Sequence, residues 1–465
     1  MSRTSSFVVA SLRLPIDISV DECGNQVVSS SPGGLVSALR PVLAQRDGVW
    51  VGWPGAIDHE LAPMKLEGLS LHPVALSQTD FEQFYEGFSN ATLWPLYHDL
   101  IVTPEFNEQW WETYRQVNER FAQAVVECAE PGATVWVQDY QLQLLPQLLK
   151  QARPDLTVGF FLHIPFPSVD LFQQLPWRRE LLVGMDAADV IGFQLSSGAD
   201  NYLQLRQSLL EPEELQRTPV VRDFPISIDY GSMAARAKQA RESGAVEVLR
   251  QRLGNPQAVL LGVDRLDYTK GISQRLQAFR QLLDQLPNHD PGSVVFVQVA
   301  TPSRERIDHY RATRDSVEQL VGRINGECAA VGTPVVHYLH RSLPAEELAA
   351  LYAAADVMVV TPLKDGMNLV SKEYVACHED GSGALVLSEF AGAAAQLNEA
   401  YLCNPHDVPS ITEAMLQALR GCGVVKDGDD AVSDAQARMS LMVDNVRTFD
   451  VHRWAQDFLE LLEVK

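Results

Sequence analysis

The strongest constraint on the fold of this chain is the alternation of short apolar runs with longer amphipathic segments. Apolar runs of strand length occur at 7–10, 134–138, 158–162 and 190–193. Segments with the apolar spacing of a helix lie between them, at 108–127, 144–151 and 180–187. Such alternation is typical of βα units, which build parallel sheets covered by helices. The sequence therefore predicts an α/β fold with doubly wound sheets.

The alternation starts again after residue 230. A long Ala-, Arg- and Glu-rich stretch, 233–253, predicts a helix, and strand-like runs follow at 259–263, 294–298, 335–338, 357–360 and 384–387. A chain of 465 residues is also too long for one ordinary core. We therefore expect two Rossmann-like domains, 1–230 and 231–450, facing a central cleft. Residues 451–465 have helical apolar spacing, and we expect this helix to pack on a domain surface.

Composition excludes several classes of protein. A hydrophobic content of 46% with 21% charged residues is typical of a soluble globular protein. No apolar run approaches the roughly 20 residues of a membrane helix, and the run at 7–10 is too short for a signal peptide. We therefore expect a cytoplasmic protein with no membrane partner. The net charge of -23 argues against a nucleic-acid partner, but a few cations in a cleft can bind a phosphate even in an acidic protein.

The segment TPLKDGMNLVSKEYVA, residues 361–376, follows an apolar run and places Asp365 and Gly366 where the next helix is expected to begin. A helix N-terminus offers unpaired N–H groups and about half a positive charge, and glycine allows a ligand to approach the backbone closely. Two interpretations remain open. Either Asp365 and the N–H groups of 366–370 hold a sugar and a diphosphate, with Glu373 on ribose hydroxyls, or Asp365 only caps the helix.

Two further loops of the second half carry cations after predicted strands. Arg265 and Lys270 lie in GVDRLDYTKG, residues 262–271, and suit a diphosphate because Arg offers a forked contact and Lys a point charge. Solvated ion pairs with Asp264 and Asp267 are the alternative. Arg304, in TPSRER at 301–306, is placed to reach a phosphate.

Polar side chains also follow the strands of the N-terminal half. Arg13 follows the first apolar run, Asp139 ends the run at 134–138, and His163 comes after 158–162 and before two prolines. We expect Asp139 and His163 at the cleft edge, since ligands of such folds bind at the carboxyl ends of the strands. The aromatic-rich segment 84–95 either stacks on a sugar ring or belongs to the core.

Taken in order, these elements resemble glycosyltransferase family 20, the retaining glycosyltransferases of GT-B fold that include the trehalose-6-phosphate synthases. The segments that carry the resemblance span nearly the whole chain: RLPI at 13–16, SPGGL at 31–35, FSNATLWP at 88–95, WVQDYQ at 136–141, FFLHIPFPS at 160–168, GVDRLDYTKG at 262–271, TPSRER at 301–306, GRING at 322–326 and DGMNLVSKEYVA at 365–376. As an ordered set they are specific, although each fragment alone would not be.

The resemblance implies a donor site for UDP-glucose or another NDP-glucose. Arg265 and Lys270 would bind the diphosphate, and Glu373 the ribose. Asp365, the backbone that follows it and His163 would hold the glucose, and the main chain at Leu343 would contact the base. The implied donor residues are Gly34, His163, Arg265, Lys270, Leu343, Asp365, Gly366, Met367, Asn368, Leu369, Val370 and Glu373.

The resemblance also implies an acceptor site for glucose 6-phosphate, made of Arg13, Tyr85, Trp94, Asp139 and Arg304. Three positions near this site differ from the family pattern. Leu12 stands where many relatives have Asn, and Gln138 and Gln141 replace histidines that some members carry.

The implied reaction moves glucose to glucose 6-phosphate and forms α,α-trehalose 6-phosphate. Arg265, Lys270, Asp139 and His163 are the implied catalytic residues. We expect no cofactor and no metal, because no Asp-x-Asp motif is placed for the diphosphate. A glucosylglycerol-phosphate synthase and a catalytically silent sugar-phosphate sensor are the alternatives. The sequence leaves nucleotide preference, allosteric regulation and a homo-oligomeric state open.

Overall fold

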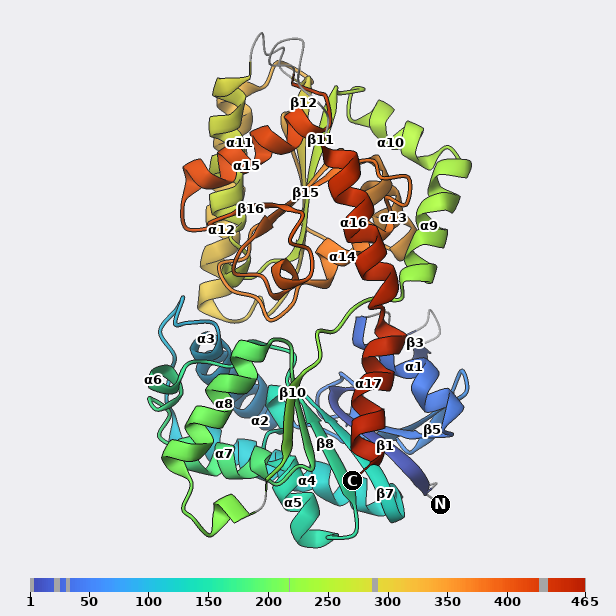
Figure 1. The fold of residues 1–465 in the computed structure, drawn as a ribbon, viewed down its shortest axis with the longest axis vertical. Coiled ribbons are helices and arrows are strands. Elements are labelled where there is room, and N and C mark those ends of the chain that lie inside the picture. Colours follow the sequence, from blue (N-terminus) through green and yellow to red (C-terminus); the bar gives the residue numbers. More distant parts are fainter. Residues whose placement is uncertain are drawn as a thin grey trace. The chain divides into compact units, whose positions relative to one another are not determined.

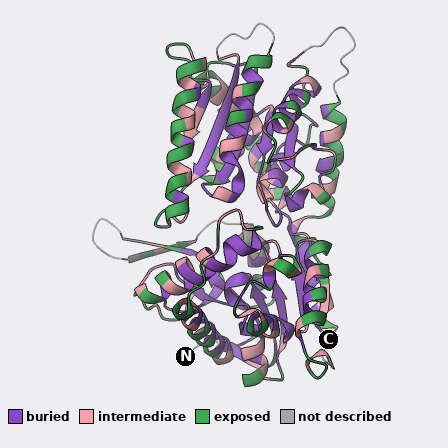
Figure 2. Cartoon of the chain, turned by 90° about the vertical axis from the view of Figure 1, so that its left-hand side faces the viewer, coloured by how far each residue is buried: buried purple, intermediate pink, exposed green. Residues whose placement is uncertain are grey.

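The computed structural model describes residues 4–20, 26–30, 34–216, 218–286, 292–425 and 434–464. The chain folds into two compact units (Figure 1). Unit 1 comprises Met1–Ile226 and His452–Lys465, and unit 2 comprises Ser227–Val451. In both, the central strands of the main sheet are buried and the outward faces of the helices are exposed (Figure 2).

Unit 1 is built on an eight-stranded sheet with the order β10-β9-β8-β7-β1-β4-β6-β5. Its neighbouring strands are parallel except for the antiparallel pair β5–β6. The bounds are β1 (Ser5–Arg13), β4 (Val49–Trp53), β5 (Met64–Leu66), β6 (Leu69–Pro73), β7 (Ala129–Gln138), β8 (Thr157–Phe161), β9 (Val190–Phe193) and β10 (Val220–Asp223). A separate antiparallel pair joins β2 (Ile16–Val20) to β3 (Gln26–Ser30).

The helical segments of unit 1 connect these strands. They are α1 (Gly34–Gln45), α2 (Gln78–Asp80), the π-helical η1 (Phe81–Leu93), α3 (Trp94–Tyr97), α4 (Glu108–Cys128), η2 (Tyr140–Leu142), α5 (Leu145–Ala152), α6 (Val169–Phe172), α7 (Arg178–Asp186), α8 (Ser196–Leu209) and η3 (Glu214–Gln216).

The C-terminal helix α17 (Val451–Glu463) packs on the sheet of unit 1. Its Phe458 ring stacks on Trp136 of β7, with ring centroids 4.7 Å apart. A Cβ at Gly159 or at Gly192 would collide with Phe458. The glycines in two otherwise apolar strands therefore make room for this helix.

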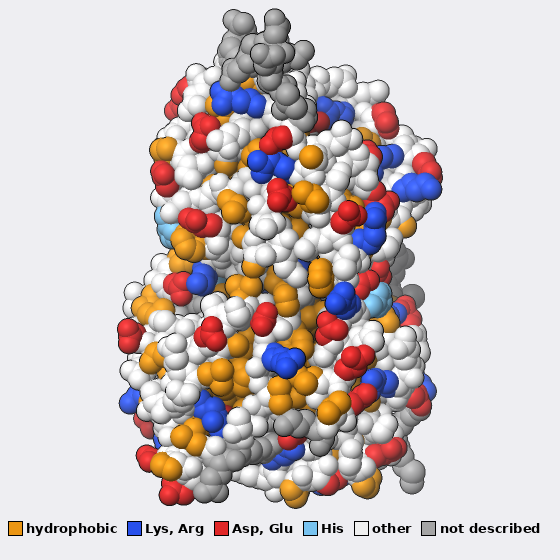
Figure 3. Space-filling model, in the orientation of Figure 1, with side chains coloured by type: hydrophobic (Ala, Val, Ile, Leu, Met, Phe, Trp, Pro, Cys, Tyr) orange, Lys and Arg blue, Asp and Glu red, His pale blue; other side chains and the backbone are white. Residues whose placement is uncertain are grey.

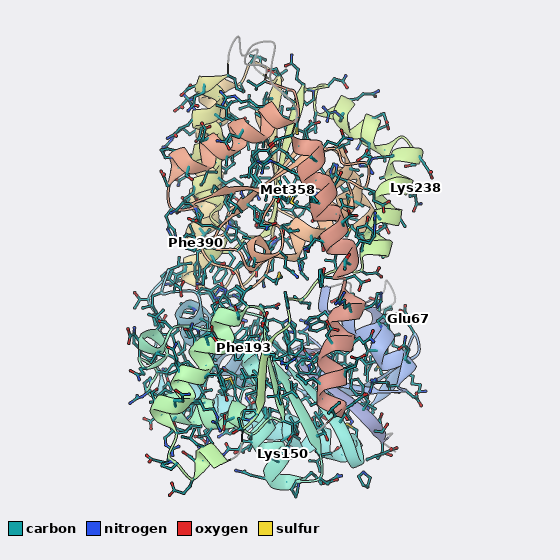
Figure 4. The ribbon with its side chains drawn as sticks, in the orientation of Figure 1. Glu67, Lys150, Phe193, Lys238, Met358 and Phe390 are labelled. Atoms are coloured by element: carbon teal, nitrogen blue, oxygen red, sulfur yellow. The ribbon has the colours of Figure 1, made fainter. Side chains whose placement is uncertain are left out.

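Unit 2 is built on a six-stranded parallel sheet with the order β13-β12-β11-β14-β15-β16. The strands are β11 (Ala258–Arg265), β12 (Val294–Thr301), β13 (Val336–Leu339), β14 (Val357–Val360), β15 (Ala384–Ser388) and β16 (Tyr401–Cys403). The middle residues of β11, β12, β14 and β15 are buried on both faces, as in a sheet covered by two helical layers. Met358 of β14, labelled in Figure 4, lies in this interior.

Helices cover both faces of the unit 2 sheet (Figure 1). Helices α11 (Ile272–Gln285), α12 (Asp308–Cys328) and α15 (Val408–Gly421) lie on one side, and α9 (Tyr230–Glu242), α10 (Ala245–Arg252) and α13 (Ala345–Ala354) lie on the other. The remaining segments are η4 (Tyr268–Lys270), α14 (Leu369–Ala376), η5 (Gly392–Ala395) and α16 (Ala435–Thr448). The predicted α/β class with doubly wound parallel sheets is confirmed.

One predicted element is wrong. The single helix expected over 233–253 is two helices, α9 and α10, separated at Gly244. Gly244 has a φ of 75°, in the left-handed region that glycine adopts without steric cost. The Ser243-Gly244 pair interrupts the apolar spacing between Ala240 and Ala245, but the Ala-, Arg- and Glu-rich composition on both sides favours a single helix.

No helix in the described part of the chain is long and apolar enough to cross a membrane. On the face shown in Figure 3, acidic and basic side chains are interspersed, and neither kind forms a continuous patch.

Candidate functional site

The loop after β14 leads into α14, whose first helical residue is Leu369. Asn368 is the N-cap: its φ is 89°, and its side chain accepts a hydrogen bond of 3.0 Å from the Ser371 N–H. The expectation that the helix starts at Asp365 and Gly366, and the alternative that Asp365 caps it, are therefore both wrong. Residues 365–368 form a loop that precedes the helix, which we call the 365–368 loop.

This loop is fastened to the segment 390–396. The Asp365 N–H donates to the Phe390 carbonyl at 3.2 Å, Gly392 N–H donates to Asp365 at 3.1 Å, and Ala393 N–H donates to Met367 at 2.7 Å. A Cβ at Gly392 would collide with the Gly366 carbonyl. Phe390 itself lies toward the margin of unit 2 (Figure 4) and is exposed. The path of the 365–368 loop is thus fixed by backbone hydrogen bonds and a close glycine contact.

The carboxylate of Asp365 meets the ammonium group of Lys270 from the loop after β11. Lys270 Nζ lies 2.6 Å from Asp365 Oδ2, and the two side chains are only 10% and 15% exposed. Asn368 Nδ2 donates to the same Asp365 oxygen at 3.2 Å. Two segments that the sequence suggests separately therefore form one charged cluster at the carboxyl ends of β11 and β14.

Arg275 of α11 lies beneath this cluster and donates hydrogen bonds to the loop after β11 and to the loop after β14. Its side chain is 0% exposed and pairs with Asp264, 2% exposed, at 2.5 Å. Its guanidinium also donates to Gln298 at 3.1 Å, to the Thr361 hydroxyl at 3.0 Å and to the Lys270 carbonyl at 3.3 Å. Asp264 thus pairs with Arg275, a residue that no sequence motif indicated.

A second buried carboxylate, Asp267, lies in the same loop. Arg304 Nη1 is 3.5 Å away, and the Tyr310 hydroxyl donates to Asp267 at 3.3 Å. Burial alone would raise the pKa of Asp267, but the positive charges of Arg304, Arg265 and Lys270 bring the pKa below its usual value. The carboxylate is therefore ionised at neutral pH, and the cations predicted to bind phosphates surround it.

Glu373 of α14 is held by a tyrosine on the neighbouring helix. The Tyr352 hydroxyl of α13 donates to Glu373 Oε2 at 2.8 Å. Burial raises the pKa of Glu373, and the hydrogen bond from Tyr352 opposes that shift. Leu343 lies in the loop between β13 and α13.

In unit 1, Asp139 and His163 lie together at the carboxyl ends of β7 and β8. Asp139 has a φ of 73°, and its Oδ1 accepts a hydrogen bond of 3.0 Å from the His163 N–H. His163 Nε2 lies 2.9 Å from Gln138 Oε1, and the ring packs against Phe161 and Trp454. Desolvation lowers the pKa of His163 to about 3, so the imidazole is neutral at pH 7.

Arg13 and Tyr85 both lie near the ring of Trp53, a residue that no sequence motif indicated. The Arg13 guanidinium lies 5.1 Å from the centroid of the Trp53 ring, and the Tyr85 ring centroid is 6.4 Å from that of Trp53. Arg13 also lies 3.6 Å from Asp17. A Cβ at Gly55 would collide with the guanidinium. A Trp at the carboxyl end of an apolar strand, in VWVGW, was the available indication.

The aromatic segment 84–95 is mainly core. Phe84, Phe88 and Trp94 are buried, whereas Tyr85 is partly exposed. Trp94 stacks on His98, with ring centroids 4.1 Å apart. Gly34 is the first residue of α1, and residues 31–33 of the SPGGL motif lie outside the described residues.

No group of three or more His, Cys, Asp or Glu side chains suited to a metal ion occurs among the residues that the structure describes.

The sequence profile of glycosyltransferase family 20 matches residues 5–464. The chain belongs to glycosyltransferase family 20, which confirms the resemblance drawn from the motifs.

Its similar relatives are trehalose-6-phosphate synthases. The trehalose-6-phosphate synthase of Mycolicibacterium smegmatis is 49% identical, over 99% of this chain and 93% of its own. That of Mycobacterium tuberculosis (strain H37Rv) is 50% identical, over 98% of this chain and 94% of its own.

Solved structures are similar over the whole chain as well. The UDP-forming α,α-trehalose-phosphate synthase from Burkholderia vietnamiensis has a TM-score of 0.88 at 34% identity and covers 100% of this chain and 97% of its own. The Burkholderia xenovorans enzyme in complex with glucose-6-phosphate has a TM-score of 0.87 at 31% identity, covering 98% and 99%.

Proposed function

We propose that this chain is a UDP-forming α,α-trehalose-phosphate synthase. It transfers glucose from UDP-glucose to the 1-hydroxyl of glucose 6-phosphate with retention and forms α,α-trehalose 6-phosphate and UDP. The observation that carries the proposal is the buried pair of Lys270 and Asp365 at the carboxyl ends of β11 and β14. A nucleotide-sugar site needs a cation that binds the diphosphate next to a carboxylate that binds sugar hydroxyls. The Lys270–Asp365 pair places these two groups side by side. Full-length relatives named for this reaction support it further.

We assign the nucleotide sugar to the C-terminal domain, 231–450. Arg265 and Lys270 bind the diphosphate, Glu373 binds ribose hydroxyls, and Leu343 contributes its main chain to the base. Asp365 and the backbone from Gly366 through Met367, Asn368 and Leu369 to Val370 bind the glucose. The fixed path of the 365–368 loop supports this role, because a preformed loop loses little conformational entropy on binding.

We assign the acceptor mainly to the N-terminal domain, 1–230. Arg13 and Tyr85 bind the sugar phosphate, Trp94 shapes the pocket, and Asp139 accepts hydrogen bonds from acceptor hydroxyls. Arg304 of unit 2 binds the acceptor phosphate. The neutral His163 hydrogen-bonds to donor glucose hydroxyls, and Gly34 lies next to the donor.

The chemistry is a displacement on one face of the sugar. Double displacement would need a carboxylate nucleophile at the anomeric carbon, and the carboxylates of the proposed site, Asp139 and Asp365, are assigned to sugar hydroxyls. Instead, the bond between the anomeric carbon and the diphosphate oxygen breaks as the acceptor oxygen bonds to that carbon. The departing diphosphate takes the acceptor proton. Arg265 and Lys270 stabilise the charge that develops on the leaving phosphate.

We propose that these two cations make a metal ion unnecessary for turnover. Activity should persist in excess chelator, measured as UDP release. Complete loss of activity that added Mg²⁺ restores would refute metal independence.

The acceptor assignment is tested by the rate of UDP release with glucose 6-phosphate, glucose or glycerol 3-phosphate at equal concentrations. We expect glucose 6-phosphate to be preferred at least a hundredfold over glucose, since Arg13 and Arg304 would otherwise face no phosphate. A preference for glycerol 3-phosphate would indicate a glucosylglycerol-phosphate synthase. Tight UDP-glucose binding without turnover would indicate a sensor.

A further inference from the structure

Asp267 occupies an unusual position for a carboxylate. Its side chain is 0% exposed, although it lies in a loop that carries two cations. One oxygen, Oδ1, accepts a hydrogen bond of 3.0 Å from the Thr269 N–H and so caps η4. The other oxygen, Oδ2, faces Arg304 and Tyr310. The cap alone requires only a side-chain oxygen, so the buried charge calls for a second explanation.

Tyr310 forms a bridge between Asp267 and Arg304. Its hydroxyl accepts a hydrogen bond of 2.5 Å from Arg304 Nη1 and donates one of 3.3 Å to Asp267 Oδ2. The Arg304 guanidinium carbon also lies 5.5 Å from the Tyr310 ring centroid. Tyr310 is buried near the start of α12, so the bridge rests on a regular element of the fold.

Arg304 itself lies in a loop and adopts a backbone conformation that is costly for its residue type. Its φ is 49°, in the left-handed region. Such conformations persist only when surrounding contacts enforce them, and they concentrate at functional sites. The ion pair with Asp267 and the hydrogen bond to Tyr310 both use Nη1, one nitrogen of a group that has five N–H donors. These contacts orient the whole planar group.

The same carboxylate also acts on the cations assigned to the donor diphosphate. The charges of Arg265 and Lys270, like that of Arg304, lower the pKa of Asp267. Coulomb interactions are reciprocal, so Asp267 weakens the positive potential that these three cations present to an anion.

We propose that Asp267 and Tyr310 are positioning residues: together they orient Arg304 toward the acceptor phosphate, and Asp267 is the shared counter-charge of Arg304, Arg265 and Lys270. This inference rests on the proposed function and adds to it a link between the two phosphate-binding groups of unit 2. It predicts that neutralising Asp267 raises the Michaelis constant for glucose 6-phosphate but strengthens the binding of UDP.

The first test removes only the bridging hydroxyl, with Tyr310→Phe. We expect the Michaelis constant for glucose 6-phosphate to rise about tenfold, kcat to change less than threefold, and the Kd for UDP in calorimetry to stay within twofold. Tyr338→Phe is the matched control, because the Tyr338 hydroxyl is also buried in unit 2 but has no hydrogen-bond partner among the described residues. Equal Michaelis constants for glucose 6-phosphate in the two variants would overturn the inference.

The second test is Asp267→Asn, which keeps an oxygen for the Thr269 cap and removes the charge. We expect the Michaelis constant for glucose 6-phosphate to rise at least tenfold, because the loss of the orienting ion pair at Arg304 outweighs the gain in its positive potential. We expect UDP to bind about threefold more tightly, because Arg265 and Lys270 lose their counter-charge. Weaker binding of both ligands, as from general damage, would overturn the inference. If Tyr310→Phe fails to fold, as judged by its thermal melt, the constants of Asp267→Asn decide whether the inference holds.

Failure of the inference is distinguishable from failure of the proposed function. If the wild-type chain releases no UDP with glucose 6-phosphate, the proposed function is wrong and the inference falls with it. If the wild-type chain is active but Tyr310→Phe matches Tyr338→Phe, only the inference is wrong.

Discussion

Replacement of Arg275 by Met should weaken unit 2 more than any other single change at the site. The substitution leaves the carboxylate of Asp264 buried, with Gln298 Nε2 at 3.3 Å as its remaining side-chain partner among the described residues. Removing one partner of a buried ion pair costs about 3–5 kcal/mol, so we expect a loss of about 4 kcal/mol. The hydrogen bonds from Arg275 to Thr361 and to the Lys270 carbonyl are lost as well, so we place the expected loss at the middle of that range and not at its lower end.

Hydrogen exchange measured by mass spectrometry is the appropriate assay, because it reports the stability of each segment separately. Since about 1.4 kcal/mol corresponds to a factor of ten, amides of β11 and β14 should exchange roughly a thousandfold faster. Amides of β8 in unit 1 serve as the internal control. Tryptophan fluorescence would be a poor substitute, because all 8 tryptophans of the chain belong to unit 1.

A second variant distinguishes the effect of the unpaired charge from the effect of lost packing. Changing Asp264 to Leu in the Arg275→Met background removes the unpaired charge, and apolar replacement of a whole buried pair is often neutral or stabilising. We therefore expect the double variant to recover most of the lost protection. A single variant with less than a tenfold effect on exchange, or a double variant less stable than the single one, would show that the buried ion pair does not hold unit 2 together in this way.

Three further predictions concern the donor site. Arg265→Ala should lower kcat by about 10²–10³, as loss of one donor to a developing oxyanion does, with little change in the Michaelis constant for glucose 6-phosphate; a comparable change in both would contradict its role. Tyr352→Phe should weaken UDP binding about tenfold by releasing Glu373, and an unchanged Kd in calorimetry would contradict that. Gly392→Ala should displace the 365–368 loop and raise the Michaelis constant for UDP-glucose at least tenfold. Gly326→Ala, where a Cβ meets nothing, should leave that constant unchanged. Equal Michaelis constants in the two variants would show that the loop tolerates the change.

Much of the fold is predictable from the sequence because buried parallel strands are continuous apolar runs. Runs such as 158–162 and 294–298 correspond to strands with buried middles. The break at Gly244 escapes a prediction made from composition, because the Ala-, Arg- and Glu-rich sequence on both sides favours one helix, although Ser243-Gly244 interrupts the apolar spacing.

The pairing of charges is the part of the site that the sequence does not specify. Lys270 and Asp365 are 95 residues apart and meet only because β11 and β14 are neighbours in the sheet. Arg275 lies in an amphipathic helix, where a charged residue is normally solvated, and its burial follows from the tertiary position of α11. The motifs indicate which charges belong near the site, and packing decides which of them pair.

The most direct test of the account is identification of the product by NMR after incubation of the purified chain with UDP-glucose and glucose 6-phosphate. We expect a disaccharide phosphate in which both anomeric carbons are α and are joined by a 1,1 linkage. A β-configured linkage would contradict retention at the anomeric carbon, and the absence of any disaccharide phosphate would contradict the proposed function.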